Sequence, residues 1–329
     1  SMYYKSLKNK NVLITGGAGF IGSNLCESLL EIGANVVCLD NFSTGHKRNI
    51  KQFLNHKNFK LIEGDIRNLN TCHKACNEIE YVLHQAALGS VPRSIKDPIS
   101  SNDVNISGFL NMLIASRDNK IQRFVFAASS STYGDSKDLP KVENKIGKPL
   151  SNYAVTKYVN ELYADVFNKS YNLNYIGLRY FNVFGKRQDP DGNYAAVIPL
   201  FVKKLMNLES PIINGDGSFS RDFTYIDNVV QINLLALTTN REKALNQIYN
   251  TAFGEKTNLI ELVNYLKKYL SYFNQDISKI NFKNKEEREG DIPHSLASIE
   301  KAKKLLGYNP THSLEMGVKE TVNWYWNNL

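Results

Sequence analysis

The sequence has no apolar run that approaches the length needed to cross a bilayer. Its first residues, YYKSLKNK, also lack the apolar core of a secretory signal. Cysteine is scarce, with 4 residues in 329, and so few thiols do not indicate a disulfide framework. We therefore expect a cytoplasmic protein with reduced, buried thiols and no membrane partner.

The cysteines offer no complete metal site. Cys26 and Cys38 fall in separate predicted elements, and Cys72, His73 and Cys76 form the single cluster of ligand-type residues. Two thiols one helical turn apart do not complete the tetrahedral set that zinc requires. We predict that the protein binds no metal.

A basic patch of the kind that binds nucleic acid is also missing. The net charge is +8, but the lysines are scattered and runs such as KNKEERE mix both signs. Single-strand binders cluster basic residues with stacking aromatics, and this pattern is not found. We expect no nucleic-acid partner, although the positive field would favour a small anionic substrate.

No Gly/Ser-rich or Pro-rich linker and no internal repeat divides the chain, which is long enough for two tightly packed domains. The first half alternates short β-branched runs with amphipathic stretches, a pattern typical of a parallel sheet covered on both faces. Strands are predicted at residues 11–17, 35–40, 59–65, 81–87, 123–130 and 174–185.

After residue 185 the alternation loosens into a mixed segment. We predict domains at 1–183 and 184–329, the second a smaller α/β substrate domain, with some of its segments packing back on the first. The second half is predicted to contain a helix near 195–207, strands at 211–214 and 221–227, helices near 228–239 and 258–270, and a terminal helix pair near 297–328.

A glycine pattern joins the first predicted strand to the first helix. In ITGGAGFIG, residues Gly17 to Gly22 satisfy G-x-G-x-x-G, and Asp40 ends the second strand eighteen residues later. Glycines allow close backbone approach to a pyrophosphate at the helix start, and the acid accepts hydrogen bonds from the adenosine ribose. The pattern predicts a doubly wound sheet of Rossmann type that binds NAD. Residues 46–48, His-Lys-Arg, leave NADP open, and a plain strand-helix turn is the structural alternative.

Three serines, residues 129–131, fall at the carboxyl end of a predicted strand, where parallel sheets place their ligands. Tyr153 and Lys157 are spaced i, i+4 and share one face of a helix. An ammonium beside a phenol lowers the phenol pKa, so the pair is a candidate general base. The simpler interpretation is that the serines cap a turn before Tyr133.

Together, the glycine fingerprint, Asp40, SSSTYG, Tyr153-x-x-x-Lys157 and LRYFNVFG resemble the extended short-chain dehydrogenase/reductases, and among them the UDP-hexose 4-epimerases. The resemblance runs from about residue 11 to residue 310. It implies tightly bound NAD and a UDP-sugar substrate. It also implies that Tyr153 is the base, that Lys157 holds the nicotinamide ribose and that Ser129 orients the sugar 4-hydroxyl.

The same resemblance implies two binding sets. The cofactor set comprises Gly16, Gly19, Phe20, Ile21, Gly22, Asp40, Asn41, Ser43, Gly45, Asp65, Ile66, Gln85, Ala86, Ala87, Tyr153, Lys157 and Tyr180. The substrate set comprises Ser90, Ser129, Ser130, Ser131, Asn182, Val197, Arg221, Arg288, Asp291 and Ser295.

Three positions bear on the reaction and the substrate. Dehydratases of the family carry Asp-Glu where this chain has Ser130 and Ser131, and its decarboxylases carry Glu at the second position. Galactose-type epimerases have a bulky tyrosine where this chain has Ser295. With a small residue at this position, the chain resembles enzymes acting on UDP-N-acetylglucosamine and UDP-N-acetylgalactosamine. UDP-glucose, UDP-galactose and UDP-hexuronates stay open as substrates. A dinucleotide-sensing regulator is the alternative from another class, disfavoured by the intact Ser-Tyr-Lys set.

The helix predicted at 151–171 is apolar over more than one face, with Val155, Val159, Leu162 and Val166 on one stripe and Tyr158, Tyr163 and Phe167 beside it. One sheet cannot cover so wide an apolar surface. We predict a homodimer through this helix and the helix at 104–117; burial within a two-domain monomer is the alternative.

Overall fold

A parallel sheet of seven strands forms the centre of the computed structural model, which describes residues 2–289 and 291–329. The strand order is β3-β2-β1-β4-β5-β6-β11, and every neighbouring pair is parallel. This order confirms the predicted doubly wound α/β fold. The strands are β1 (Asn11–Thr15), β2 (Asn35–Asp40), β3 (Phe59–Glu63), β4 (Tyr81–His84), β5 (Arg123–Ser129), β6 (Tyr175–Tyr180) and β11 (Gln247–Thr251).

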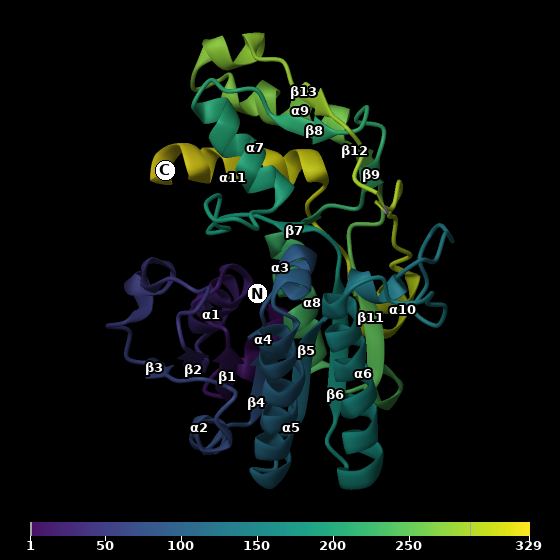
Figure 1. The fold of residues 1–329 in the computed structure, drawn as a ribbon. Helices are drawn as coiled ribbons and strands as arrows, with labels where there is room; N and C mark the ends of the chain where they lie inside the picture. Colours follow the sequence, from purple (N-terminus) through teal and green to yellow (C-terminus); the bar gives the residue numbers. More distant parts are fainter. Residues whose placement is uncertain (1, 290) are drawn as a thin grey trace.

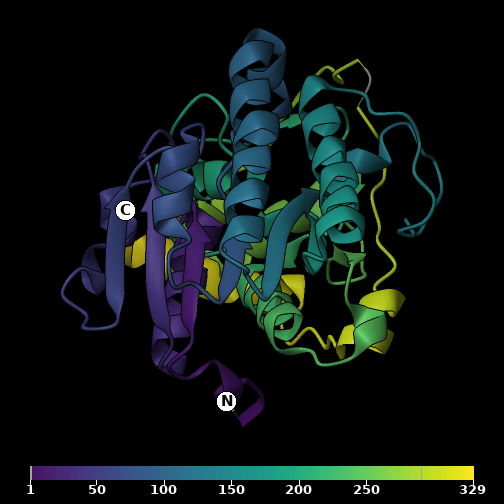
Figure 2. The same cartoon turned by 90° about the horizontal axis from the view of Figure 1, so that it is seen from below.

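Helices cover both faces of the sheet, which is why its central strands are almost continuously apolar. Figure 2 shows one layer of helices on one side of the strands, formed by α2 (Leu69–Ala75), α5 (Phe109–Asp118) and α6 (Asn152–Tyr171). The opposite face packs against α1 (Phe20–Ile32) and α8 (Ile226–Thr238). The short helices α3 (Val91–Lys96) and α4 (Pro98–Asn102) and a π-helical turn (Asp103–Gly108) lead into α5.

Two elements of the sheet layer come from the second half of the sequence. Helix α8 was expected as a helix, but strand β11 was not predicted, because a five-residue edge strand beside β6 carries a weak pattern. Strand β6 is also shorter than expected. It ends at Tyr180, and Asn182 has a positive φ of 38° that turns the chain before Val183. The division at residue 183 stays a prediction.

The remaining elements form a smaller mixed part above the carboxyl edge of the sheet (Figure 1). Its helices are α7 (Val197–Met206), α9 (Leu259–Leu270) and α11 (Leu314–Asn328), while α10 (Glu300–Leu306) lies against β11. Three two-stranded sheets accompany them: β7 (Val183–Phe184) with β10 (Thr224–Tyr225), β8 (Ile212–Asn214) with β13 (Lys283–Lys285), and β9 (Ser220–Arg221) with β12 (Thr257–Asn258).

The structure bears on three expectations from the composition, which concern membrane-spanning helices, cysteine thiols and surface charge. Within residues 2–289 and 291–329, no helix is both long and apolar enough to span a membrane. All four cysteines are free and buried, and burial raises the pKa of the Cys72 and Cys76 thiols to about 12. Neutral thiols are poor zinc ligands.

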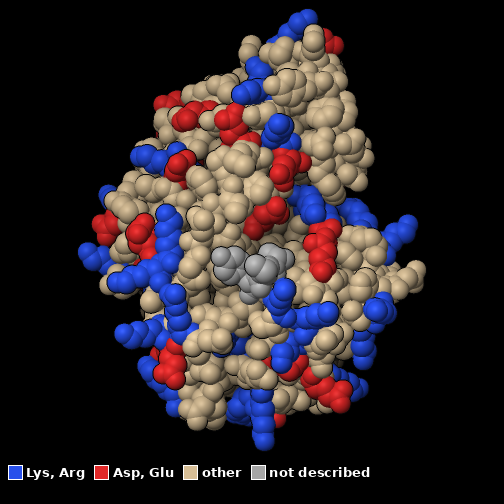
Figure 3. Space-filling model, turned by 180° about the vertical axis from the view of Figure 1, so that it is seen from behind, with Lys and Arg blue, Asp and Glu red and all other residues tan. Residues whose placement is uncertain are grey.

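On the face shown in Figure 3, Lys and Arg side chains alternate with Asp and Glu rather than gathering in one patch.

Helix α6 is tied to the sheet by a buried ion pair. Arg179 of β6 donates from Nε and Nη2 to the two carboxylate oxygens of Glu161, at 2.9 and 2.7 Å. Its Nη1 donates to the Glu143 carbonyl at 2.9 Å, and the guanidinium lies 4.9 Å from the centre of the Tyr133 ring. The guanidinium of arginine donates to both carboxylate oxygens at once, and these hydrogen bonds offset the free-energy cost of burying the two charges.

Replacing Glu161 with Gln should destabilise the protein, because the buried guanidinium would lose its counter-charge. The expected loss is about 3–5 kcal/mol in the free energy of unfolding, measured by urea denaturation. Glu31→Gln, at an exposed position on α1, is the matched control and should change little. Equal stability of the two variants would contradict an anchoring role for the pair.

Candidate active site

Four adjoining hollows run along the carboxyl edge of the sheet and under the smaller part, and we name each by one lining residue. The Asp40 hollow shares Thr44 and Gln85 with the Tyr153 hollow. The Tyr153 hollow shares Asn182 with the Ser295 hollow, which in turn shares Arg221 and Arg288 with the Val197 hollow. Because of these shared walls, the hollows adjoin, and we refer to the four together as the groove.

Every residue of the two predicted binding sets lines this groove. The Asp40 hollow contains Gly16, Gly19, Asp40, Asn41, Ser43, Gly45, Asp65, Ile66, Gln85, Ala86 and Ala87. The Tyr153 hollow adds Phe20, Ile21, Gly22, Ser90, Ser129, Ser130, Tyr153, Lys157, Tyr180 and Asn182. The other two add Ser131, Val197, Arg221, Arg288, Asp291 and Ser295.

The glycine loop between β1 and α1 is compact for a steric reason. A Cβ on Gly22 would lie 2.0 Å from the Gly16 carbonyl oxygen, and Gly16 itself has a φ of 68°. Helix α1 begins after Gly19, which has no side chain to cap the first N–H groups. These free N–H groups and the helix dipole make the loop an anion site, as its sequence predicts.

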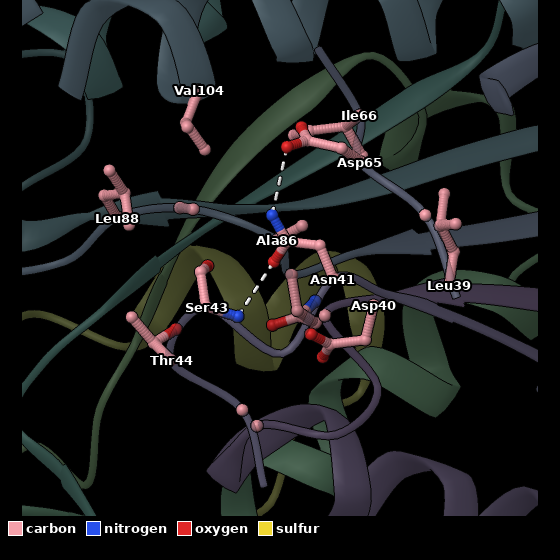
Figure 4. A pocket seen from close by; sticks show the side chains of 16 residues that line it. Leu39, Asp40, Asn41, Ser43, Thr44, Asp65, Ile66, Ala86, Leu88 and Val104 are labelled. Carbon is pink, nitrogen blue, oxygen red and sulfur yellow. Dashed lines mark hydrogen bonds between the residues drawn. The ribbon is translucent and has the colours of Figure 1, made fainter. Parts of the chain in front are cut away.

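Asp40 is held in place by the loop that it faces. Its Oδ2 accepts a hydrogen bond from the Ala18 N–H at 2.9 Å, and its Oδ1 accepts one from the Phe42 N–H at 2.8 Å. Burial raises the pKa of the carboxyl, and these N–H groups oppose that shift. Figure 4 shows Asp40 on the wall of the hollow, below Asn41, whose amide donates to Asp65 Oδ2 at 3.1 Å.

The basic residues that left NADP open are engaged elsewhere. His46 Nε2 lies 2.8 Å from Asp189 Oδ2, and Arg48 pairs with the same carboxylate at 3.7 Å. Lys47 lies over the Phe42 ring. None of the three lines the Asp40 hollow. A 2′-phosphate there would meet the Asp40 carboxylate with no cation to balance it, which favours NAD.

Tyr153 and Lys157 lie together in the Tyr153 hollow, but the expected effect on the pKa of the phenol is wrong. Burial raises the pKa of Tyr153, and a hydrogen bond with Ser129 offsets only part of that shift. Lys157 Nζ donates to the Ala127 carbonyl at 3.0 Å and lies 6.0 Å from the centre of the Tyr153 ring. Burial lowers the pKa of Lys157 to about 8, so its charge is itself weakly held.

The serines at the end of β5 cap a turn, as the simpler interpretation from the sequence predicts, and they also line the groove. Ser129 Oγ accepts a hydrogen bond from the Ser131 N–H at 3.1 Å and so caps the 3₁₀ turn 130–133. Its hydroxyl also lies 2.7 Å from Ser131 Oγ. Ser129 and Ser130 line the Tyr153 hollow, and Ser130 and Ser131 line the Ser295 hollow. No carboxylate stands at these positions.

Residues distant in the sequence meet at the other end of the groove. Arg221, Arg288 and Asp291 line both the Ser295 and the Val197 hollows, and Gly290, between the last two, lies outside the described residues. Burial lowers the pKa of Arg221. The segment around Ser295 is fixed because its N–H donates to the Ser220 carbonyl at 3.1 Å and the Ala297 N–H donates to buried Asp222 at 3.2 Å.

Sequence reasoning missed several lining residues. Arg93, Tyr194 and Gln188 line the groove, although each belongs to a segment that lacks a recognisable motif. Arg93 lies only three residues after Ser90, so its position near a predicted residue was the one available signal.

Among the described residues, Asp227, His312 and Glu320 bring ligand-type atoms within 4.8 Å of one another. These three residues line none of the four hollows.

Comparison with known proteins shows the family to which the chain belongs. Residues 12–252 match the family model described as "NAD dependent epimerase/dehydratase family". A putative UDP-glucose 4-epimerase of Methanocaldococcus jannaschii is 38% identical, over 96% of this chain and 99% of that protein.

Two solved structures are similar over their whole length. The UDP-N-acetylglucosamine 4-epimerase of Methanobrevibacter ruminantium, in complex with UDP-N-acetylmuramic acid, has a TM-score of 0.91 and 38% identity, covering 98% of this chain and 100% of that one. The UDP-glucuronic acid 4-epimerase of Bacillus cereus, bound to UDP-glucuronic acid and NAD, has a TM-score of 0.87 and 30% identity, covering 96% and 99%.

The doubly wound sheet, the glycine loop and the acid at the end of β2 define a dinucleotide-dependent enzyme. The chain belongs to the NAD-dependent epimerase/dehydratase family, and its cofactor is NAD.

Proposed function

We propose that this chain, an NAD-dependent UDP-sugar 4-epimerase, interconverts UDP-N-acetylglucosamine and UDP-N-acetylgalactosamine. One observation carries the proposal. Ser129, Tyr153 and Lys157 share a hollow with the glycine loop, and the adjoining hollow is lined by the small side chain of Ser295. A proton acceptor and a dinucleotide site therefore lie side by side, with space beyond them for a sugar.

When bound, NAD would supply hydride transfer in the proposed reaction: the hydride would leave C4 of the sugar and return to the opposite face of that carbon. Tyr153, as phenolate, takes the proton of the 4-hydroxyl and later gives it back. Ser129 hydrogen-bonds the same hydroxyl, and Lys157 holds the nicotinamide ribose. Burial raises the pKa of Tyr153, and the hydrogen bond with Ser129 acts in the other direction and favours the phenolate.

Between the two hydride transfers the 4-keto sugar must present its other face. Arg221 and Arg288 are proposed to hold the diphosphate while the sugar turns about its phosphate link, because a guanidinium pairs with two phosphate oxygens at once. Ser130 and Ser131 carry no acid or base that would take the ketone on to elimination or decarboxylation. The 4-keto group is then reduced back to the alcohol, and epimerisation results.

The N-acetylated substrates are favoured by the residues that wall the Ser295 hollow. Ser131 and Ser295 are small, and Asn182 and Ser130 can hydrogen-bond a sugar substituent. The similar M. ruminantium structure is that of a UDP-N-acetylglucosamine 4-epimerase. UDP-glucose with UDP-galactose, and UDP-hexuronates, are the alternatives, and relatives of both kinds resemble this chain. Turnover of a panel of the three substrate pairs, followed by chromatography of the C4 epimers, tests the assignment.

Tyr153→Phe should lower turnover by roughly two or more orders of magnitude, because the ring still packs but the proton acceptor is lost. In the wild type, kcat/KM should rise with pH above neutrality, since burial raises the pKa of the phenol and only the phenolate is active. The variant should lose this rise.

Tyr158→Phe is the matched control, because Tyr158 lies on the same helix, is half-buried and lines none of the hollows. It should retain both the rate and the pH profile. Near-wild-type turnover of Tyr153→Phe would remove Tyr153 from the role of base.

Ser295→Tyr should shift specificity from the acetylated to the plain UDP-hexoses. A rigid ring beside the acetamido group would cost about 1–3 kcal/mol, or roughly tenfold to more than a hundredfold in kcat/KM for UDP-N-acetylhexosamines. UDP-glucose and UDP-galactose carry only a hydroxyl at C2, so their turnover should survive. The ratio of kcat/KM for the two pairs measures the effect.

Ser278→Tyr places the same ring at an exposed serine outside the hollows and should leave the ratio unchanged. If Ser295→Tyr folds and also leaves the ratio unchanged, the substrate assignment is wrong, although the 4-epimerase chemistry would stand.

The proposed enzyme is a homodimer. On α6, Val155, Leu162 and Val166 are 46%, 50% and 53% exposed, while Leu110 and Ile114 of the neighbouring α5 are half-buried. Burial of this apolar stripe against a second copy would remove it from water, and a twofold axis would make the patch self-complementary.

Light scattering at micromolar concentration should therefore give twice the 37.3 kDa mass of the chain. Leu162→Lys should shift the mass to that of a monomer, because an ammonium would be buried without a partner. Leu54→Lys, at a leucine that is 45% exposed elsewhere, should leave the dimer intact. A monomeric wild type would overturn the proposal.

A further inference from the structure

Helix α3 places an arginine on the wall of the Tyr153 hollow. Ser94 Oγ accepts a hydrogen bond from the Tyr153 N–H at 3.0 Å, and the Asn152 amide donates to the Ser94 carbonyl at 3.0 Å. Ser90 Oγ accepts a hydrogen bond from the Arg93 N–H at 3.3 Å where α3 begins. The position of Arg93 is thus set by the same contacts that set the start of α6.

The Arg93 side chain reaches across to the smaller part of the protein. Its guanidinium lies 4.8 Å from the centre of the ring of Tyr194, in the segment between β7 and α7. Both residues line the Tyr153 hollow. Arginine stacks well on an aromatic face, so the ring restrains the guanidinium at the wall.

The charge of Arg93 is not balanced by the described protein. Its Nε is buried without a hydrogen-bond acceptor among residues 2–289 and 291–329. No Asp or Glu lines the Tyr153 hollow, and the one other basic residue in its wall is Lys157, whose ammonium donates to the Ala127 carbonyl. Because arginine stays charged in proteins, an unpaired buried donor of this kind calls for an anion.

The same hollow contains the residues that offer free N–H groups at the start of α1, Phe20, Ile21 and Gly22. An anion held by a helix start and a guanidinium together matches a pyrophosphate. The diphosphate of the UDP-sugar is assigned to Arg221 and Arg288, which line other hollows and not this one.

We propose that Arg93 pairs with the pyrophosphate of NAD, and that the stack on Tyr194 holds it there so that the cofactor is retained between turnovers. This inference concerns the cofactor and is independent of the sugar that the enzyme takes.

The test compares Arg93→Met, Arg93→Lys and Tyr194→Ala with the wild type. Released NAD per chain is measured after purification and denaturation, and the Kd of the stripped protein for NAD is measured by calorimetry. Arg93→Met should lose most of its NAD and bind it roughly tenfold or more weakly, with a smaller salt dependence of Kd. The NAD content and Kd of Arg93→Lys and Tyr194→Ala should lie between those of the wild type and Arg93→Met. Arg93→Lys loses the planar guanidinium, and Tyr194→Ala loses the stacked ring.

Arg117→Met is the matched control, because Arg117 stacks on Tyr171 at 4.6 Å but lines none of the hollows. It should keep its NAD and its Kd, with circular dichroism and the melting temperature reporting folding for every variant. Tyr194→Phe retains an aromatic stack and should also keep its NAD.

Two results would overturn the proposal. One is an unchanged NAD content and Kd in folded Arg93→Met. The other is an unchanged Kd for NAD with a weaker Kd for UDP, which would assign Arg93 to the substrate diphosphate. If the wild-type protein binds NAD normally but shows no 4-epimerase activity, the proposed reaction is wrong, and the NAD measurements on the variants still decide the role of Arg93.

Discussion

The position of helix α6 is the constraint on which the rest of the site depends. The helix carries Tyr153 and Lys157, and it is fixed to β6 by the buried ion pair of Glu161 with Arg179 and to β5 by the bond from Lys157 to the Ala127 carbonyl. Both partners are polar groups inside an apolar layer, where a lost partner is costly and a shifted helix would lose several partners together. The sheet therefore holds the side chains of Tyr153 and Lys157 in fixed positions.

Burial also sets the chemical state of these side chains. It raises the pKa of Tyr153 and lowers that of Lys157, so desolvation makes both charged forms less stable than they would be in water. Arg93, Arg221 and Arg288 line successive hollows of the groove, and each is proposed to pair with phosphate of the dinucleotide or of the UDP-sugar.

The two ends of the groove are built from different parts of the chain. The hollows of Asp40 and Tyr153 are built mainly from the strand ends and the loops that follow them. Ser295 and Arg288 come from a segment more than a hundred residues later in the chain. That segment is fixed by two of its N–H groups, which donate to the Ser220 carbonyl and to the Asp222 carboxylate.

Local chemistry explains what could be predicted from the sequence alone. The glycine loop, Asp40 and the i, i+4 spacing of Tyr153 and Lys157 depend on a few neighbouring residues, and the first six strands carry continuous apolar runs. Tertiary structure decided the remainder: the edge strand β11, the meeting of Arg93 with Tyr194, and the direction of the pKa shift at Tyr153. Each of these depends on burial or on contacts between segments far apart in the chain, and neither burial nor distance is encoded in a local pattern.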